Sequence, residues 1–362
     1  MLRTGIVGLG SVATWHRRGI ERTPGATLTA VADVDARRAE RAGDEWGVSA
    51  YEDAESLRRA EELDWVHVCT PVGTHATVAE PFLRSGVHAL VEKPFAESRA
   101  AYESIRTAAD EGGVRATVVH NQVFYPPVQT ALGWIDEGRF GRLHGVSVRW
   151  LEGNDPREPD RGDWVLDLPG GEFGEGIVHP IYVGLRAAGY PAAESAVHVE
   201  PINTTGDEAV EYDGICLAYR SEADVACTVQ HHSNTRGSRQ LEFFAEGARV
   251  VVDIPTQSVQ YYPRGYGADS TVSFPMANAA YWNVYNAARA VRSTVTAYAR
   301  RAAARLRGGR YAVHDTHTPV IRREAAAIAG TGTGPTPTEE ADWTNRIFTR
   351  INERYAATVD GE

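Results

Sequence analysis

The first third of the chain alternates short apolar runs with helix-like segments, and this alternation constrains the fold more than any other feature. In chain order the apolar runs read TGIVGL, ATLTAVAD, DWVHVCT, VHALVE and RATVVH. Apolar strands separated by helices indicate a parallel sheet covered on both faces, because right-handed crossovers place the helices there. We therefore expect an α/β chain that begins with a doubly wound, nucleotide-binding Rossmann domain.

A glycine-rich turn, GLGSVA, follows the first apolar run and fits the fingerprint of dinucleotide binding. Gly8 would allow the tight turn, Gly10 would let the backbone approach a pyrophosphate, and Ala13 would let the helix lie close to the strand. By itself this pattern is weak, but here it stands between a strand and a helix. Gly8, Gly10, Ser11, Val12 and Ala13 are the expected phosphate-binding residues.

The second apolar run ends at Asp33, about 20 residues beyond the glycines. A carboxylate there accepts hydrogen bonds from the ribose hydroxyls and repels a 2′-phosphate, which favours NAD over NADP. Arg37 and Arg38 follow closely and leave NADP open, since they could bind that phosphate or be ordinary exposed helix residues.

Lys93 is the only lysine among the 37 lysine and arginine residues of the chain. It follows the apolar run VHALVE, at the carboxyl edge of the expected sheet, where ligands of such sheets bind. A lysine ends in one compact ammonium whose pKa responds to its surroundings, whereas an arginine stays charged. Pro94 restricts Lys93 to extended conformations. The position of Lys93 suggests a role in catalysis. The alternative is that Lys93 is present by chance in a chain whose composition is poor in lysine.

Composition excludes several classes of partner. The net charge of -11 and the pI near 5.6 would repel nucleic acid and anionic membranes. No apolar run is long enough to span a membrane, and the chain begins without a signal-peptide layout. Cys69, Cys216 and Cys227 have no metal-binding spacing and suit a reducing compartment. We expect a cytoplasmic protein without a metal; the basic run 298–310 is expected to be a solvated helix face.

From about Phe124 the pattern changes to several consecutive strands with short polar turns. Such strands predict a largely antiparallel sheet with helices on one face, and thus a C-terminal α+β domain. The expected division is 1–122 for nucleotide binding and 123–362 for substrate binding and oligomerisation. The other face of this sheet is the expected interface of a homodimer or homotetramer.

In the second domain, Glu175 and His179 stand four residues apart in GEGIVHPIYVGLRAAG. Pro180 lacks an N–H and is tolerated only in the first turn of a helix, so the helix should begin near Ile177. The positive end of the helix dipole disfavours imidazolium and favours carboxylate. We predict a neutral His179 and an ionised Glu175 at pH 7.

Three stretches together resemble one family, namely GIVGLGSVA, DWVHVCTPVGTHATVAEPFLRSGVHALVEKPFA and GGEFGEGIVHPIYVGLRAAG. They are similar to the glucose-fructose oxidoreductase, inositol dehydrogenase and MocA family, and the middle stretch is the most specific. The resemblance covers most of the chain, more loosely in the C-terminal half. It implies a nicotinamide cofactor and hydride transfer to or from a carbinol carbon of a sugar or cyclitol.

The resemblance also implies roles in the first domain. Lys93 would donate a hydrogen bond to the reacting oxygen, and the proline after it tends to be cis. Thr70, Pro71 and His75 match a cofactor-contacting segment, and Glu92 matches the glutamate before the lysine. Asn121 directly follows the last apolar run, RATVVH, where it either faces nicotinamide and substrate or caps a turn.

In the second domain the resemblance makes His179 the general acid/base and puts Glu175 in the place of an aspartate. Two departures stand out: Pro169–Gly171 replaces three glycines, and Tyr182 stands where an acidic residue is frequent. A structural histidine is the alternative for His179. The longer glutamate leaves open which sugar hydroxyl it would meet.

The charged loop 152–164 precedes this motif. It is either a solvated surface loop or a substrate lid in which Arg157, Arg161 or Trp164 contacts the sugar. The expected function is an NAD(H)-dependent sugar or cyclitol dehydrogenase or reductase. A redox-neutral glycosidase or lyase that oxidises its sugar transiently, and a non-catalytic cofactor-binding protein, are the alternatives.

Overall fold

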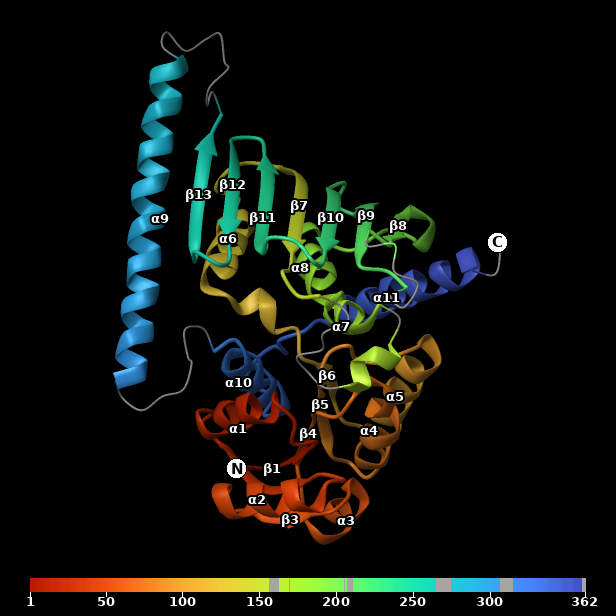
Figure 1. Cartoon of the computed structure of the whole chain (residues 1–362). Helices are drawn as coiled ribbons and strands as arrows, with labels where there is room; N and C mark the ends of the chain where they lie inside the picture. The colour runs from red at the N-terminus through yellow and green to blue at the C-terminus, as the bar shows by residue number, and fades with distance from the viewer. Residues whose placement is uncertain are drawn as a thin grey trace. The chain divides into compact units, whose positions relative to one another are not determined.

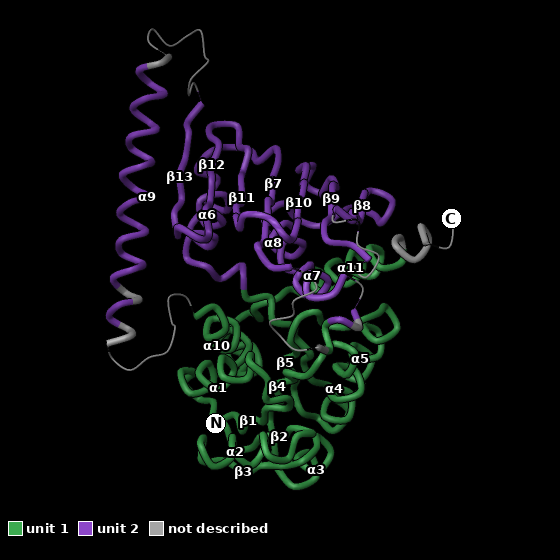
Figure 2. The backbone as a smooth tube through the Cα atoms, in the orientation of Figure 1, with its two compact units in different colours: residues 1–121, 161–165, 315–353 green, residues 122–160, 166–314, 354–362 purple. Residues whose placement is uncertain are grey.

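The computed structural model describes residues 1–155, 163–168, 170–204, 206, 211–264, 275–306 and 315–359. The chain forms two compact units, shown in Figures 1 and 2. Unit 1 comprises 1–121, 161–165 and 315–353, and unit 2 comprises 122–160, 166–314 and 354–362. The sequence-based division at residue 122 stays a prediction about folding domains. It did not foresee that 315–353 would group with the N-terminal residues.

Unit 1 is built on a six-stranded parallel sheet with strand order β3-β2-β1-β4-β5-β6. The strands are β1 (Leu2–Val7), β2 (Ala26–Ala32), β3 (Ser49–Tyr51), β4 (Trp65–Val68), β5 (His88–Val91) and β6 (Ala116–Val118). The order reverses direction at β1 and β4, which is the point where doubly wound sheets bind their ligands. The predicted α/β class is confirmed.

The helices of the repeating part of unit 1 are α1 (Ala13–Glu21), α2 (Ala36–Trp46), α3 (Ala54–Ala60), α4 (His75–Arg84) and α5 (Arg99–Gly112). Three of them begin at residues whose side chains accept a backbone N–H of the first turn: Asp35, Asp53 and Ser98. Gly47 and Gly113, both left-handed, end α2 and α5. Local capping thus fixes where the crossovers start and stop.

Two helices from the end of the chain complete unit 1: α10 (His317–Ile328) and α11 (Thr338–Val359). A methyl group added at Gly19 of α1 would lie 2.2 Å from Ile321 Cδ1 of α10, so the two helices are in close contact. Buried Glu324 of α10 accepts hydrogen bonds from Thr117 of β6 and from Arg115. These contacts hold α10 against α1 and β6.

Unit 2 is built on a seven-stranded sheet with order β13-β12-β11-β7-β10-β9-β8. The strands are β7 (Leu143–Leu151), β8 (Val197–Ile202), β9 (Gly214–Arg220), β10 (Ala226–His232), β11 (Ser238–Ala245), β12 (Ala248–Asp253) and β13 (Ser258–Pro263). β7 and β10 pair in parallel, and the other neighbours are antiparallel. The predicted α+β class is confirmed.

The helices of unit 2 are α6 (Pro126–Asp136), α7 (Gly171–Gly176), α8 (Val178–Ala188) and α9 (Pro275–Leu306). Gly184 of α8 comes within van der Waals reach of Cys227 and Val229, the inward residues of β10, so α8 packs on the sheet. Asn286 of α9 bonds the backbone of Tyr261 in β13. The basic run 298–310 lies partly in α9 and partly outside the described residues. Among the helices described, none has the length and apolar character needed to cross a membrane.

Candidate functional site

The glycine turn of unit 1 joins β1 to α1. Gly8 has φ +88°, and a methyl group there would lie 2.7 Å from the Cys69 carbonyl, so the turn tolerates only glycine. A methyl group at Gly10 would have no protein atom within 4 Å. Open space therefore lies beside the backbone at the position where the sequence predicts a diphosphate.

Two further observations test whether a dinucleotide fits this turn. α1 begins at Ala13 after Val12 without a side-chain cap, so its first N–H groups are not satisfied by a protein side chain. Thr70 Oγ1, just beyond β4, is buried and makes no hydrogen bond with the residues that the structure describes. Gly10 and Ser11 are exposed. These residues fit a bound diphosphate and nucleotide.

Asp33 follows β2 and is 6% exposed. Its Oδ2 accepts the backbone N–H of Leu9 at 2.7 Å, which fixes the carboxylate beside the glycine turn. Arg38 lies 3.4 Å from Asp33 and 3.6 Å from Asp35, so two carboxylates accompany its charge. A 2′-phosphate at this place would meet the same carboxylates, which favours NAD.

His75, the first residue of α4, links two segments of the site rather than facing solvent. Its Nδ1 is 2.9 Å from the Pro94 carbonyl and its Nε2 is 2.8 Å from the Thr70 carbonyl. Burial lowers the pKa of His75, although these carbonyls favour its protonated form. The ring holds the Thr70–Pro71 segment against the Lys93–Pro94 segment, whose peptide bond is cis. Its expected part in cofactor binding stays a prediction.

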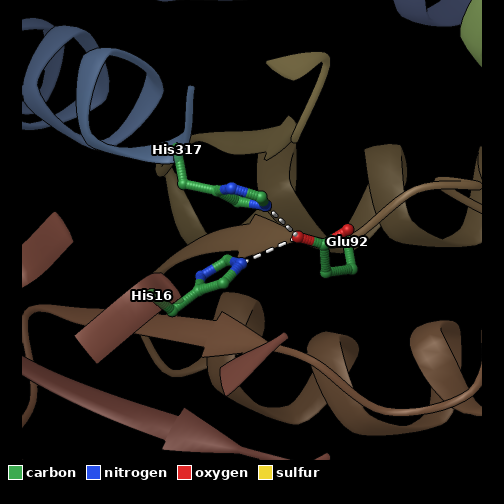
Figure 3. Close-up of side chains that lie close together, drawn as sticks. All are labelled: His16, Glu92 and His317. Carbon is green, nitrogen blue, oxygen red and sulfur yellow. Dashed lines mark hydrogen bonds and ion pairs between the residues drawn. The ribbon is translucent and has the colours of Figure 1, made fainter. Parts of the chain in front are cut away.

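Glu92 and Lys93 follow β5, and Glu92 collects hydrogen bonds from several directions. Oε1 of Glu92 lies 2.8 Å from His16 Nε2 and 3.5 Å from His317 Nε2. Figure 3 shows both imidazoles directed at this carboxylate oxygen. Oε2 accepts the backbone N–H of Lys93 at 3.1 Å. Behind His16, its Nδ1 lies 2.8 Å from His67 Nδ1 of β4. The carboxylate thus fixes the backbone at which the Lys93 side chain leaves the sheet.

The protonation of this cluster follows from its burial. Burial opposes ionisation of Glu92, but the hydrogen bonds from His16 and His317 outweigh it and hold the pKa of Glu92 well below its usual value. Burial also lowers the pKa of His16 and of His67. An ionised carboxylate only accepts, so neutral His16 donates Nε2–H to Glu92. Its Nδ1 then accepts Nδ1–H from His67.

His16, Glu92 and His317 also form the one group with metal-ligand geometry in the described part of the chain, with ligand atoms within 4.8 Å of one another. Two imidazoles and a carboxylate suit zinc. In this structure, however, the 2.8 Å separation between His16 and Glu92 is that of a hydrogen bond. The cluster could not be predicted from the sequence, because its members lie on α1, after β5 and on α10.

Asn121 is 8% exposed and is tied to the beginning of α10. Its Nδ2 donates to Thr316 Oγ1 at 3.2 Å and lies 3.5 Å from His317 Nε2. His317 Nε2 can donate to Glu92 or accept from Asn121, but not both at once. The expected contact of Asn121 with nicotinamide and substrate stays a prediction.

In unit 2, α8 begins at Val178 with Ile177 as its N-cap, as Pro180 predicted. His179 lies in the first turn of α8, while Glu175 lies in the preceding helix α7 rather than in a loop. Both side chains are buried, with residue exposures of 7% and 5%. Gly170 and Gly171 have positive φ at the beginning of α7, and Pro169 lies outside the described residues.

Two aromatic residues orient His179. Its Nδ1 lies 2.7 Å from the hydroxyl of Tyr182, which also accepts the backbone N–H of Gln122 at 3.1 Å. The imidazole stacks on Trp150 of β7, with ring centroids 6.3 Å apart. The sequence marked Tyr182 only as a departure from the family pattern. Helical spacing i, i+3 was the available signal that it contacts His179.

Glu152 follows β7 and was not singled out as a site residue. Trp150 Nε1 and Arg239 Nη2 donate to its Oε1 at 3.0 and 2.9 Å. Burial opposes ionisation of Glu152, but His231 and Arg239 lower its pKa to about 2. Glu152 is therefore ionised beside the residue that stacks on His179.

Of the possible lid residues in loop 152–164, Trp164 is half-buried in a 3₁₀ turn, Asp163–Asp167. Arg157 and Arg161 lie outside the described residues. The role of this loop stays a prediction.

Residues 2–120 match the model of a family described as an oxidoreductase family with an NAD-binding Rossmann fold. The matched residues, about a third of the chain, are thus similar to the glucose-fructose oxidoreductase, inositol dehydrogenase and MocA family. The description of this family assigns an NAD-binding Rossmann fold to the matched residues.

Curated relatives match over different lengths. UDP-N-acetylglucosamine 3-dehydrogenase of Acidithiobacillus ferrooxidans is 25% identical over 74% of this chain and 78% of its own. Inositol 2-dehydrogenase of Rhizobium meliloti is 26% identical over 59% of this chain and 60% of its own. The match thus spans less than two thirds of the second relative.

Solved structures share the fold over nearly the whole chain. The WlbA dehydrogenase of Bordetella pertussis, in complex with NADH and UDP-GlcNAcA, has a TM-score of 0.75 at 17% identity, covering 99% of this chain and 96% of that one. A levoglucosan dehydrogenase in complex with NADH and levoglucosan has a TM-score of 0.75 at 17% identity, covering 98% and 97%.

Proposed function

We propose that this protein transfers a hydride between NAD(H) and a carbinol carbon of a sugar, sugar derivative or cyclitol. The observation that carries the proposal lies within unit 1. The glycine turn leaves space beside Gly10, and Lys93 follows β5 in the same sheet, held there by Glu92. Relatives named as sugar or cyclitol dehydrogenases support the same reaction class.

We assign NAD binding to the glycine turn and to the segment after β4. Gly10, Ser11 and Val12 would hold the diphosphate through backbone N–H groups. Gly8 and Ala13 would shape the turn around it, because their own N–H groups already bond the carbonyls of Ala32 and Gly10. Asp33 would accept the adenosine ribose hydroxyls. Thr70, Pro71, Glu92 and Asn121 would form the nicotinamide end, with His75 holding it in place. The bound nicotinamide supplies the acceptor or donor of the hydride.

Residues of the chain itself would accept the substrate proton and stabilise the developing negative charge. Lys93 would donate a hydrogen bond from its ammonium to the substrate oxygen, which stabilises the alkoxide as the hydroxyl loses its proton. His179 would accept that proton on Nε2. A neutral ring that accepts on Nε2 carries its hydrogen on Nδ1, which then donates to Tyr182 Oη. Glu175 and Trp164 would contact the other hydroxyls of the substrate.

The experiment begins by denaturing the purified protein and identifying any released nucleotide. The protein is then supplied with NAD, and polyols and sugars are screened for absorbance at the nicotinamide band. We expect stoichiometric NADH formation with at least one free polyol or sugar. Bound NAD with turnover of glycosides but no net NADH would instead establish the redox-neutral glycosidase or lyase. Bound NAD without any turnover would favour a non-catalytic protein.

We also propose that the protein acts in the cytoplasm as a homodimer or homotetramer formed through the sheet of unit 2. The free thiols of Cys69, Cys216 and Cys227 support a reducing compartment. Exposed apolar side chains recur at heptad spacing on α9, beside β13, and support association; they are Tyr281, Val284, Val291, Val295 and Tyr298. Light scattering should show an oligomer, and a monomer at micromolar concentration would contradict this.

A further inference from the structure

Unit 2 contains a cavity of about 450 Å³ that no assigned role uses. It is formed by the end of β7, the beginning of β11, the turn between β12 and β13, and one face of α9. Residues that define its chemistry are Glu152, Asn154, Ser238, Arg239, Gln257 and Tyr298. The volume falls in the range of small-molecule sites.

The charges at the cavity wall cancel. Glu152 and Arg239 form an ion pair at 2.9 Å, and they are the only charged residues among the described residues that line the cavity. The guanidinium is therefore already neutralised by a carboxylate of the same wall. A diphosphate needs several unpaired cationic groups or backbone N–H groups. An uncharged ligand with many hydroxyls matches this wall better.

The remaining lining residues suit such a ligand. Asn154, Ser238 and Gln257 offer amides and a hydroxyl, which can both donate and accept hydrogen bonds. Tyr125 and Tyr298 add aromatic rings with polar ends. Sugars present hydroxyl groups at their edges and C–H groups on their faces, so this mixture of side chains fits a sugar ring.

The cavity adjoins the proposed acid/base within the same unit. Trp150 stacks on His179 at 6.3 Å between centroids, and the Arg239 guanidinium carbon lies 5.0 Å from the Trp150 ring centroid. Glu152 Oε2 lies 3.8 Å from where a methyl group on Gly176, between Glu175 and His179, would be. Arg239 of the cavity wall is thus linked to the imidazole through the Trp150 ring.

At one rim of the cavity, the backbone is held in an energetically unfavourable conformation. Gln257, in the turn between β12 and β13, has φ +55°, which side-chain-bearing residues rarely adopt. The turn is fixed from both sides, by Thr294 of α9, which donates to the Thr256 carbonyl at 2.9 Å, and by Asp253, which accepts the Thr256 N–H at 2.8 Å. Strain kept in place by its surroundings is typical of ligand-binding positions.

We propose that this cavity is a second subsite that binds an uncharged sugar ring. The substrate is then a disaccharide or other glycoside whose reacting ring lies at His179 and whose second ring fills the cavity. This inference rests on the proposed function and narrows it, because it disfavours nucleotide sugars as substrates.

The test uses the full-length protein with NAD and compares glucose with methyl β-glucoside, cellobiose, maltose, trehalose and UDP-glucose. We expect kcat/KM for at least one disaccharide to exceed that for glucose by about tenfold or more. Ala297→Trp, on the face of α9 that lines the cavity, should remove this advantage and leave glucose turnover unchanged. Ala299→Trp, an exposed position of the same helix, is the matched control and should change neither.

Equal kcat/KM for glucose and every disaccharide, a preference for UDP-glucose, or an advantage that survives Ala297→Trp would overturn the subsite. If no sugar reduces NAD, the proposed function fails. Calorimetric titration of the same disaccharides into the wild type and Ala297→Trp then still decides the subsite. Binding that only the wild type shows supports it, and binding by both variants or by neither contradicts it.

Discussion

Two neighbouring glycines in the turn after β1 should respond to alanine in opposite ways. Gly10→Ala adds a methyl group that meets no protein atom within 4 Å, and Gly10 does not have positive φ. The free energy of unfolding should therefore change by no more than about 0.5 kcal/mol. The same methyl group occupies space that the account reserves for the diphosphate. Overpacking of about 1–3 kcal/mol there would weaken NAD binding about 5- to 150-fold.

Gly8→Ala should instead damage the fold. Its φ of +88° costs an alanine about 1–2 kcal/mol, and the new methyl group would lie 2.7–2.8 Å from backbone atoms of Cys69 and Thr70. Adding about 1–3 kcal/mol for that overlap gives a loss of roughly 2–5 kcal/mol of unfolding free energy. The difference arises because Gly8 faces protein backbone and Gly10 faces open space.

The assay combines urea unfolding with fluorescence titration of NADH. Gly133→Ala is the matched control, because a methyl group there also meets nothing within 4 Å but lies on α6 of unit 2. It should leave NADH affinity unchanged. Wild-type NADH affinity in a folded Gly10→Ala protein would refute the placement of the diphosphate beside this turn.

Lys93→Arg should keep NAD affinity but lower kcat by about 10²-fold or more, because a planar guanidinium cannot replace a compact donor at the reacting oxygen; near-normal kcat would refute that role. His317→Leu removes a hydrogen-bond donor from Glu92, so the pKa of Glu92 should rise and the acid limb of the kcat/KM profile should move to higher pH. His317→Gln can still donate a hydrogen bond to Glu92 and should restore the wild-type pH profile. Identical pH profiles for the two variants would show that the hydrogen bond from residue 317 to Glu92 does not set the acid limb. Burial lowers the pKa of His16 and His67, so the unfolded chain takes up protons first as pH falls below about 6.5. The free energy of unfolding is then highest above that pH, and below it falls by up to about 1.4 kcal/mol per pH unit for each histidine. Urea unfolding at pH 7.5, 6.5 and 5.5 should show this decrease. The same free energy of unfolding at all three pH values would contradict it.

The sequence predicted those parts of the fold that depend on local periodicity and capping. Apolar runs separated by helices gave the parallel sheet, and Pro180 placed the beginning of α8 within one residue. In both cases the decisive interactions lie within a few residues of chain. Glycine spacing likewise located the turn beside Gly10, because the geometry of that turn is local.

Long-range pairing could not be predicted in the same way. His317 reaches Glu92 only because α10, from the end of the chain, packs on α1 through Ile321 at Gly19. Nothing in the spacing of these residues encodes that contact. The ion pair of Glu152 could not be predicted either, because its partner, Arg239, lies on another strand. Charged residues in a loop carry no local signal of the partners that they will meet.

The proposed catalytic roles are that Lys93 donates a hydrogen bond to the substrate oxygen and that His179 takes up its proton. The most direct measurement is the single-turnover rate of NADH formation, with saturating NAD and sugar, in Lys93→Met, His179→Asn and the double variant. The account predicts a loss of about 10²- to 10⁴-fold for each single variant, with unchanged NAD affinity. The double variant should be little slower than the worse single variant, because both groups serve one event. A loss in the double variant equal to the product of the two single losses, or a single variant with wild-type rate, would contradict it.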